Sequence, residues 1–138
     1  MRFMIIVKAT RDSEAGVMPD EKLLDEMGAF HKELADAGVL LDANGLQPTS
    51  KAVRVKYSGK QRTIIDGPFT EAKELIAGYT IIDVKSRDDA LEWLRRFPNP
   101  AIDQGEGEIE LRQIFELDDF APGPATERLR AMESTLKK

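Results

Sequence analysis

The chain has 138 residues, of which 41% are hydrophobic and 33% are charged. This balance predicts one soluble globular domain, with enough residues for a core but too few for two ordinary domains. The formal net charge is −5 and no basic stretch stands out, which argues against nucleic acid as a partner. The absence of cysteine excludes disulfides, thiolate nucleophiles and cysteine-based metal centres, and it fits a reducing compartment.

The apolar run at residues 3–7 ends at Lys8, which makes it too short for the core of a signal peptide. No run of about 18 apolar residues follows, as a membrane-spanning helix would need. We therefore expect a cytoplasmic protein that does not associate with a membrane.

The first part of the chain predicts a strand, a loop and a helix. Residues 3–7 are apolar and β-branched, which indicates a buried strand, and the polar residues 11–16 indicate a loop. Apolar residues then recur at helical spacing over residues 19–37, and Gly38 is a natural stop. The apolar stripe consists of Leu23, Met27, Phe30, Leu34 and Ala37.

The middle of the chain predicts strands. Residues 39–42 begin a second strand, Asn44-Gly45 is a turn signal, and residues 46–48 could continue the strand at a sheet edge. Residues 52–57 alternate apolar and basic side chains, and residues 63–65 run back after a tight connection. This pattern predicts a β-hairpin whose first strand is half exposed, with its apolar face buried.

The last part predicts a strand at 76–84, a helix capped by Ser86 and ended after Phe97, and a strand at 107–117. A Pro-Gly-Pro linker at 122–124 leads to a charged helix at 126–136. We therefore divide the chain into a domain at 1–117 and a linker with a C-terminal helix at 118–138.

The element order predicts an α+β fold: a ferredoxin-like βαββαβ sandwich with an inserted β-hairpin. Both helices would cover one face of an antiparallel sheet. The other face would still carry apolar side chains, and a second copy of the chain is the simplest partner to cover it. We therefore expect a homodimer formed through the open sheet face.

Residues 66–74 read DGPFTEAKE and are followed by Gly78-Tyr79. This stretch resembles the signature of the DGPF-type branch of the YCII-related proteins. Supporting similarities, which together extend over most of residues 1–117, are AGVL at 37–40, GL at 45–46, ALEW at 90–93, FP at 97–98 and IELR at 109–112. The chain departs from the usual closing strand at Gln113, where proline is commoner in the family.

The resemblance implies a dimeric α/β barrel, in which two ferredoxin-like subunits pack sheet against sheet with a pocket on each side. Most members have no assigned function. Many are encoded beside sigma factors of the extracytoplasmic type, which suggests a regulatory or accessory role. Distant relatives on the same fold include small-molecule isomerases and a dehydrochlorinase. In the broader family, a histidine on the first helix and a nearby aspartate are the proposed site.

His31 is the only histidine, and it lies at the border of the apolar stripe of the first helix. An imidazole there could pair with a carboxylate and transfer a proton, or it could be an idle, partly exposed helix residue. The resemblance places the family's histidine at this position. Asp66, at the end of the hairpin, and Asp42, on the second strand, are its candidate partners. Asp66 could instead have only a structural role, because aspartate often stabilises a turn by accepting backbone hydrogen bonds.

Glu71 and Lys73 could orient a polar substrate, although such clusters are more often solvated turns. Tyr79 could donate to a ligand or pack at an interface. Arg112 could hold an anion or pair with a carboxylate across the sheet. We carry all four as candidate substrate-binding residues.

The sequence contains no phosphate loop, GxGxxG turn or HExxH motif. A single histidine without cysteine argues against a transition metal, although carboxylates could bind Mg²⁺ weakly. We therefore expect no cofactor and no metal. Three functions remain open. The first is a cofactor-free enzyme that uses a His/Asp pair for proton transfer on a small molecule. The second is a ligand- or protein-binding accessory module linked to sigma-factor regulation. The third is a purely structural dimer.

Overall fold

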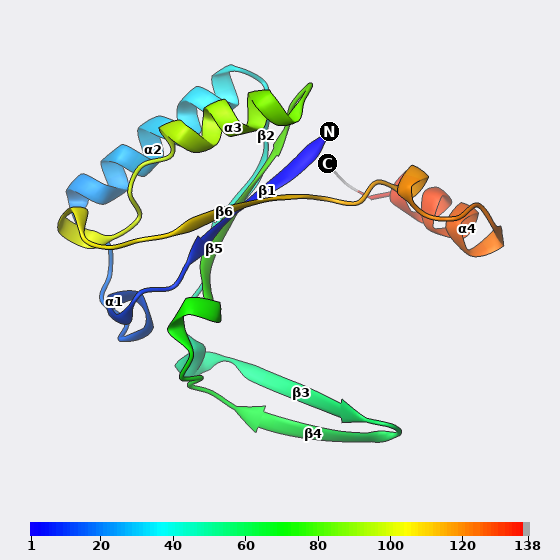
Figure 1. The fold of residues 1–138 in the computed structure, drawn as a ribbon, viewed down its shortest axis with the longest axis horizontal. Helices are drawn as coiled ribbons and strands as arrows, with labels where there is room; N and C mark the ends of the chain where they lie inside the picture. The colour runs from blue at the N-terminus through cyan, green and yellow to red at the C-terminus, as the bar shows by residue number, and fades with distance from the viewer. Residues whose placement is uncertain (137–138) are drawn as a thin grey trace.

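A computed structural model describes residues 1–136. Its main sheet consists of four antiparallel strands in the order β2-β5-β1-β6. The strands are β1 (Arg2–Lys8), β2 (Leu40–Gly45), β5 (Ile76–Asp83) and β6 (Ile109–Gln113). The two long helices, α2 (Glu21–Asp36) and α3 (Arg87–Arg96), lie on one face of this sheet (Figure 1). The predicted α+β fold is confirmed.

The hydrophobic core lies between this sheet and the two helices. Alternate strand residues point to opposite faces, so Phe3 and Ile5 of β1 and Ile82 of β5 face the helices. Phe30 and Leu34 of α2 pack against them. Burial of each such side chain contributes about 1.5–3 kcal/mol, so this layer accounts for much of the stability of the domain.

Both core helices begin directly after a capping residue, of which Ser86 was predicted from the sequence. The Asp20 carboxylate accepts a hydrogen bond from the backbone N–H of Leu23, and the Ser86 hydroxyl accepts one from the backbone N–H of Asp89. Each cap satisfies a donor that the first helical turn leaves without a partner. The prediction of both helices is therefore confirmed.

Two local predictions are wrong. Residues 11–16 are not all loop, because Thr10 and Ser13 form a reciprocal capping box that begins the short helix α1 (Arg11–Glu14). Asn44-Gly45 is not a turn but the last pair of β2, opposite Tyr79 and Gly78. Pairing with a central strand outweighs the local turn preference of this dipeptide.

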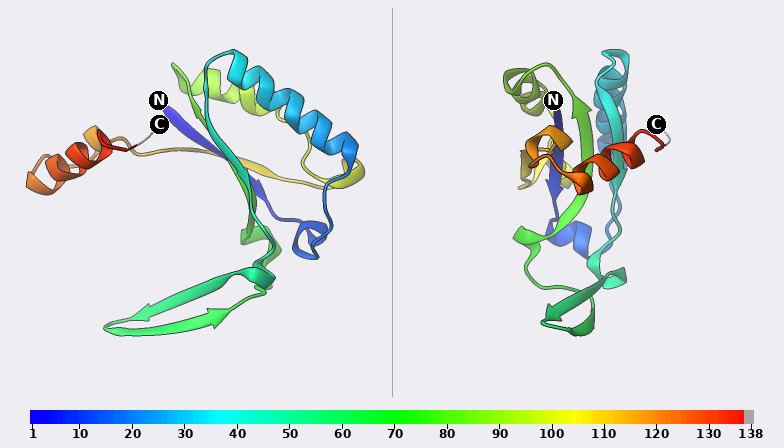
Figure 2. Two further views of the ribbon diagram at one scale, coloured as in Figure 1. Left: turned by 180° about the vertical axis from the view of Figure 1, so that it is seen from behind. Right: turned by 90° about the vertical axis from the view of Figure 1, so that its right-hand side faces the viewer.

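Two arms extend from the face of the sheet that α2 and α3 leave open (Figures 1 and 2). One is the hairpin of β3 (Val53–Ser58) and β4 (Gln61–Asp66), and the other is α4 (Pro124–Glu133). The predicted hairpin is confirmed, but the prediction that its first strand is only half exposed is wrong. Every residue of both strands is exposed, including Tyr57 at 67% and Ile64 at 72%.

Short 3₁₀ turns join these elements. They are η1 (Thr49–Lys51), η2 (Ala72–Glu74), η3 (Ile102–Gln104) and η4 (Leu117–Asp119). In the part of the chain that the structure describes, no helix has the length and apolar character needed to cross a membrane.

Candidate functional site

A cavity of about 1030 Å³ lies between α2 and the sheet, at the end of the domain where α1 and the connection after β2 meet. Its wall is mainly apolar, with Met27 and Gly28 from α2 and Phe97 from the end of α3. Val17 and Met18, on the segment between α1 and α2, contribute exposed side chains to its rim. A concave, mostly apolar site with few polar groups is typical of small-molecule binding.

His31 and Thr80 supply polar groups to this wall. The ring of His31 is held at both nitrogens: Nδ1 lies 2.7 Å from the carbonyl oxygen of Met27, and Nε2 lies 2.8 Å from Oγ1 of Thr80. A carbonyl oxygen can only accept, so Nδ1 carries the proton and donates it. In the neutral ring Nε2 then accepts the hydroxyl proton of Thr80.

Two aromatic rings enclose the imidazole on its helix side. The ring centroids of Phe30 and Phe97 lie 5.7 Å and 6.0 Å from that of His31, with interplanar angles of 89° and 80°. These edge-to-face contacts and the two hydrogen bonds fix the orientation of the ring. The predicted position of His31 at the border of the buried face explains why it is only partly buried.

The direct partner of His31 is thus a threonine, and within residues 1–136 neither predicted aspartate is hydrogen-bonded to it. Asp42 lies opposite Ile81 on the open face of the sheet. There it accepts a hydrogen bond from the hydroxyl of Tyr79 at 3.2 Å and another from Nδ2 of Asn44, also at 3.2 Å. Asp66 is the exposed last residue of β4, paired with Val53. A pairing of His31 with either aspartate stays a prediction.

The four candidate substrate-binding residues are dispersed. Glu71 and Lys73 are exposed and do not line the cavity. Arg112 forms an ion pair with Glu110 on the open face. Tyr79 lies on the cavity wall, but its strand neighbour Thr80 faces the helices, so the Tyr79 ring points to the open face.

Charged neighbours shift two carboxyl groups near these candidates. A hydrogen bond from Arg112 and a second from Lys8 lower the pKa of Glu110. A hydrogen bond with the Glu71 carboxyl and the like charge of that group raise the pKa of Glu74. Glu71 therefore affects the pKa of Glu74 and does not contribute to the cavity.

Thr80 is a candidate site residue that sequence reasoning missed. The alternation of β5 does contain a signal for it, because Gly78, Thr80 and Ile82 occupy the face that points to the helices. A hydroxyl on a buried apolar face needs a hydrogen-bond partner, and Thr80 is only 2% exposed. The one histidine on the facing helix is the natural partner.

The DGPF stretch joins the hairpin to the rim of the cavity. Gly67 donates to the carbonyl of Ala52 at 2.9 Å, and a Cβ atom at Gly67 would lie 1.7 Å from the carbonyl oxygen of Thr49. The Thr49 hydroxyl donates to the Glu14 carboxylate of α1 at 2.5 Å and accepts from the N–H of Phe69 at 3.0 Å. The motif therefore has a structural basis in this chain.

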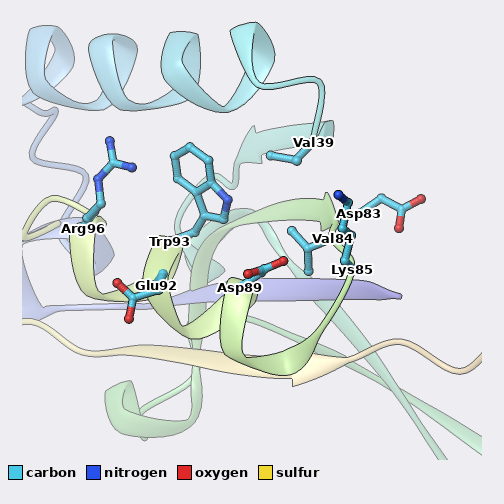
Figure 3. Close-up of a pocket in the computed structure, with 8 residues that line it drawn as sticks. All are labelled: Val39, Asp83, Val84, Lys85, Asp89, Glu92, Trp93 and Arg96. Carbon is cyan, nitrogen blue, oxygen red and sulfur yellow. The ribbon is translucent and has the colours of Figure 1, made fainter.

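A second, smaller hollow of about 540 Å³ lies along α3 (Figure 3). Figure 3 shows the Trp93 ring pointing from α3 towards α2, with charged side chains around the opening. One of these, Arg96, lies over the Trp93 ring at 4.7 Å and forms an ion pair with Glu33. Because Arg96 is already paired and no histidine lines it, this hollow is the weaker candidate.

Metal binding finds no support in the described part of the chain. No group of three or more His, Asp or Glu side chains among those residues is arranged to hold a metal ion. His31 and Thr80 are the hydrogen-bonded polar pair of the large cavity, and Asp12, Glu14 and Lys51 add charged groups to its lining.

Comparison with known proteins agrees with the resemblance seen in the sequence. A family model described as the YCII-related domain matches residues 1–118. A protein of Rhizobium meliloti (strain 1021), described as uncharacterized, is 32% identical over 96 residues, which are 70% of this chain and 77% of that protein.

Proposed function

Because the chain belongs to the YCII-related domain family, whose model spans residues 1–118, we propose that it acts on a small molecule in the cavity beneath α2. The molecule is mostly apolar and carries a polar group that meets the hydrogen-bonded pair of His31 and Thr80. His31 exchanges a proton with it, without a cofactor. The observation that carries this proposal is the placement of the only histidine, with its ring fixed, in the wall of a mainly apolar cavity.

The physical support for a proton-transfer role is the state of the imidazole. Its Nδ1 proton is held by the Met27 carbonyl, so the basic lone pair is confined to Nε2, on the side of the cavity wall formed by Thr80. A fixed tautomer is what a general base requires. Asp42 or Asp66 would take part only if binding of the small molecule or of a second subunit brought it towards this ring.

A second function is non-catalytic: a binding module for a ligand or protein, linked to sigma-factor regulation. One observation favours it. Both ring nitrogens of His31 already have hydrogen-bond partners, and neither partner is a carboxylate. In that case the cavity selects a ligand by shape, and His31 and Thr80 only position it.

We also propose that the subunit has the ferredoxin-like topology and forms a homodimer through its open face, giving the barrel that the family resemblance implies. The strand order β2-β5-β1-β6 with two helices on one side supports this. So do the apolar side chains of Met4 and Ile81, which are partly exposed on the face without helices. The hairpin and α4 project on that side, where they would contact the second copy of the chain (Figure 2).

Deuterium exchange separates the enzyme from the binding module. Small carbonyl compounds are incubated with the protein in D₂O, and deuterium uptake at carbon next to the carbonyl is followed by mass spectrometry. The enzyme predicts uptake that His31→Gln abolishes and that Lys32→Gln, a change at the exposed neighbour, leaves intact. Saturable binding without uptake would favour the binding module, and uptake that survives His31→Gln would remove His31 as the base.

A further inference from the structure

The hydrogen bonds of His31 leave it without a free site for a ligand. An imidazole has one hydrogen-bonding position at each nitrogen, and here Nδ1 is occupied by the Met27 carbonyl and Nε2 by Thr80. The Thr80 hydroxyl has one proton and two lone pairs. Once its proton is given to Nε2, Oγ1 retains lone pairs that can accept, at the small part of Thr80 that is exposed, 2% of the residue.

We propose that Thr80, not His31, is the group that contacts the ligand, and that it relays a proton from a weakly acidic hydroxyl, a phenol or an enol, to His31. This inference rests on the proposed use of the cavity and specifies its ligand class. It follows from the two occupied nitrogens and from the position of Thr80 in the cavity wall.

The relay has a balanced sequence of bonds. The ligand O–H donates to Oγ1 of Thr80, whose own proton lies on the 2.8 Å hydrogen bond to Nε2. Transfer breaks the ligand O–H bond and the original Thr80 O–H bond, and it forms a new Thr80 O–H bond and the Nε2–H bond. The products are a ligand oxyanion, an intact threonine hydroxyl that now donates to that oxyanion, and an imidazolium.

The surroundings favour a neutral ligand at the start. Phe30 and Phe97 enclose the ring, and Met27 and Gly28 present apolar surface to the cavity. The neutral pair offers only acceptors, so it selects a hydrogen-bond donor over an ether or a hydrocarbon of the same shape. A charged ligand would lose part of its hydration on entry and would gain no donor from the neutral His31–Thr80 pair.

The probe is 4-nitrophenol. Its methyl ether, 4-nitroanisole, is the control because it has a similar shape but no hydroxyl to donate. Binding is followed through the imidazole NMR signals of His31, the only histidine. Absorbance of the phenolate is read at a pH where the free phenol is uncharged. We expect 4-nitrophenol to bind about tenfold more tightly than 4-nitroanisole, the equivalent of one hydrogen bond, and to show a phenolate band only when bound. Thr80→Val should abolish that band, and Thr80→Ser should retain it.

The outcomes separate the two proposals. Equal affinity for both probes, or a phenolate band that survives in Thr80→Val, would overturn the relay while leaving the cavity as a binding site. A neutral ring with its proton on Nε2, read from ¹⁵N shifts of the free protein, would also overturn the relay. If neither probe perturbs His31 or other cavity residues, both the relay and the proposed use of the cavity fall.

Discussion

The Nε2 atom of His31 and the Oγ1 atom of Thr80 lie 2.8 Å apart and join α2 to β5 at the wall of the large cavity. Thr80 is almost fully buried, and this hydrogen bond is the contact that satisfies its hydroxyl. The pair therefore has two roles: it fixes the helix on the sheet, and it places the imidazole at the cavity.

A double-mutant cycle measures the coupling of this pair. Thr80→Val and His31→Ala should each destabilise the fold, and the double variant should cost less than their sum by about 1 kcal/mol, because one hydrogen bond is counted twice. Urea unfolding of the four proteins gives the coupling energy. Strictly additive costs would mean that the two groups do not interact in solution.

Gly28 lies inside α2, where a Cβ atom would meet nothing within 4 Å. Glycine in a helix interior is less favourable than alanine by about 0.5–1 kcal/mol, so Gly28→Ala should raise the free energy of unfolding by that amount. Thermal unfolding checks it. A loss of stability instead would show that the cavity wall at Gly28 is closed in solution.

Gly67→Ala should be strongly destabilising, by more than about 2 kcal/mol, because its methyl group would overlap the Thr49 carbonyl. Gly123→Ala is the matched control, since its backbone is extended and a Cβ atom there has open space. Urea unfolding compares the two. Similar small costs at both positions would remove the structural explanation of the DGPF motif.

The ion pair between Lys8 of β1 and Glu110 of β6 should weaken in acid. The folded-state pKa of Glu110 is lowered by Arg112 and Lys8, so its contribution to stability is present above the ordinary value of 4.5 and is lost as pH falls through the lowered pKa. Glu110→Gln should therefore cost stability at neutral pH and little at a pH below that range. Chemical unfolding at both pH values tests this, and an equal cost at both would contradict it.

The open face predicts a dimer that one charge can disrupt. Ile81 lies on that face between Met4 and Asp42, so Ile81→Arg would replace an apolar contact of the proposed interface with a larger, charged side chain. Sedimentation at micromolar concentration should give a dimer for the wild type and a monomer for Ile81→Arg. Ala29→Arg, on the exposed side of α2, should remain dimeric. A wild-type protein that sediments as a monomer would contradict the proposed dimer.

The fold was predictable where local patterns agree with tertiary packing. The apolar stripe predicts α2 because Met27, Phe30 and Leu34, which recur at helical spacing, also contact the core. The cap at Ser86 predicts the start of α3. The hairpin was predictable as an element but not in its environment. Alternation at Val53, Val55 and Tyr57 predicts a buried face, whereas this single chain leaves that face exposed.

The site was predictable only in part, because hydrogen-bond partners depend on tertiary register. His31 could be placed at the edge of the apolar stripe from helical spacing alone. Its partner depended on which β5 residue faces α2, and that is set by the pairing of Ile5 with Thr80. Asp42 was a reasonable candidate from residue type, but the same register places it on the opposite face of the sheet.

The most direct test of the central claim is occupation of the cavity, read at the only histidine. A set of small, mostly apolar alcohols and phenols is titrated into ¹⁵N-labelled protein while the His31 ring signals are followed. The comparison is between Gly28→Leu, which fills the cavity, and Ala29→Leu, which adds the same side chain on the exposed side of α2. We predict saturable shifts in the wild type and in Ala29→Leu that disappear in Gly28→Leu. Shifts that persist unchanged in Gly28→Leu, or that never reach His31, would contradict a binding site beneath α2.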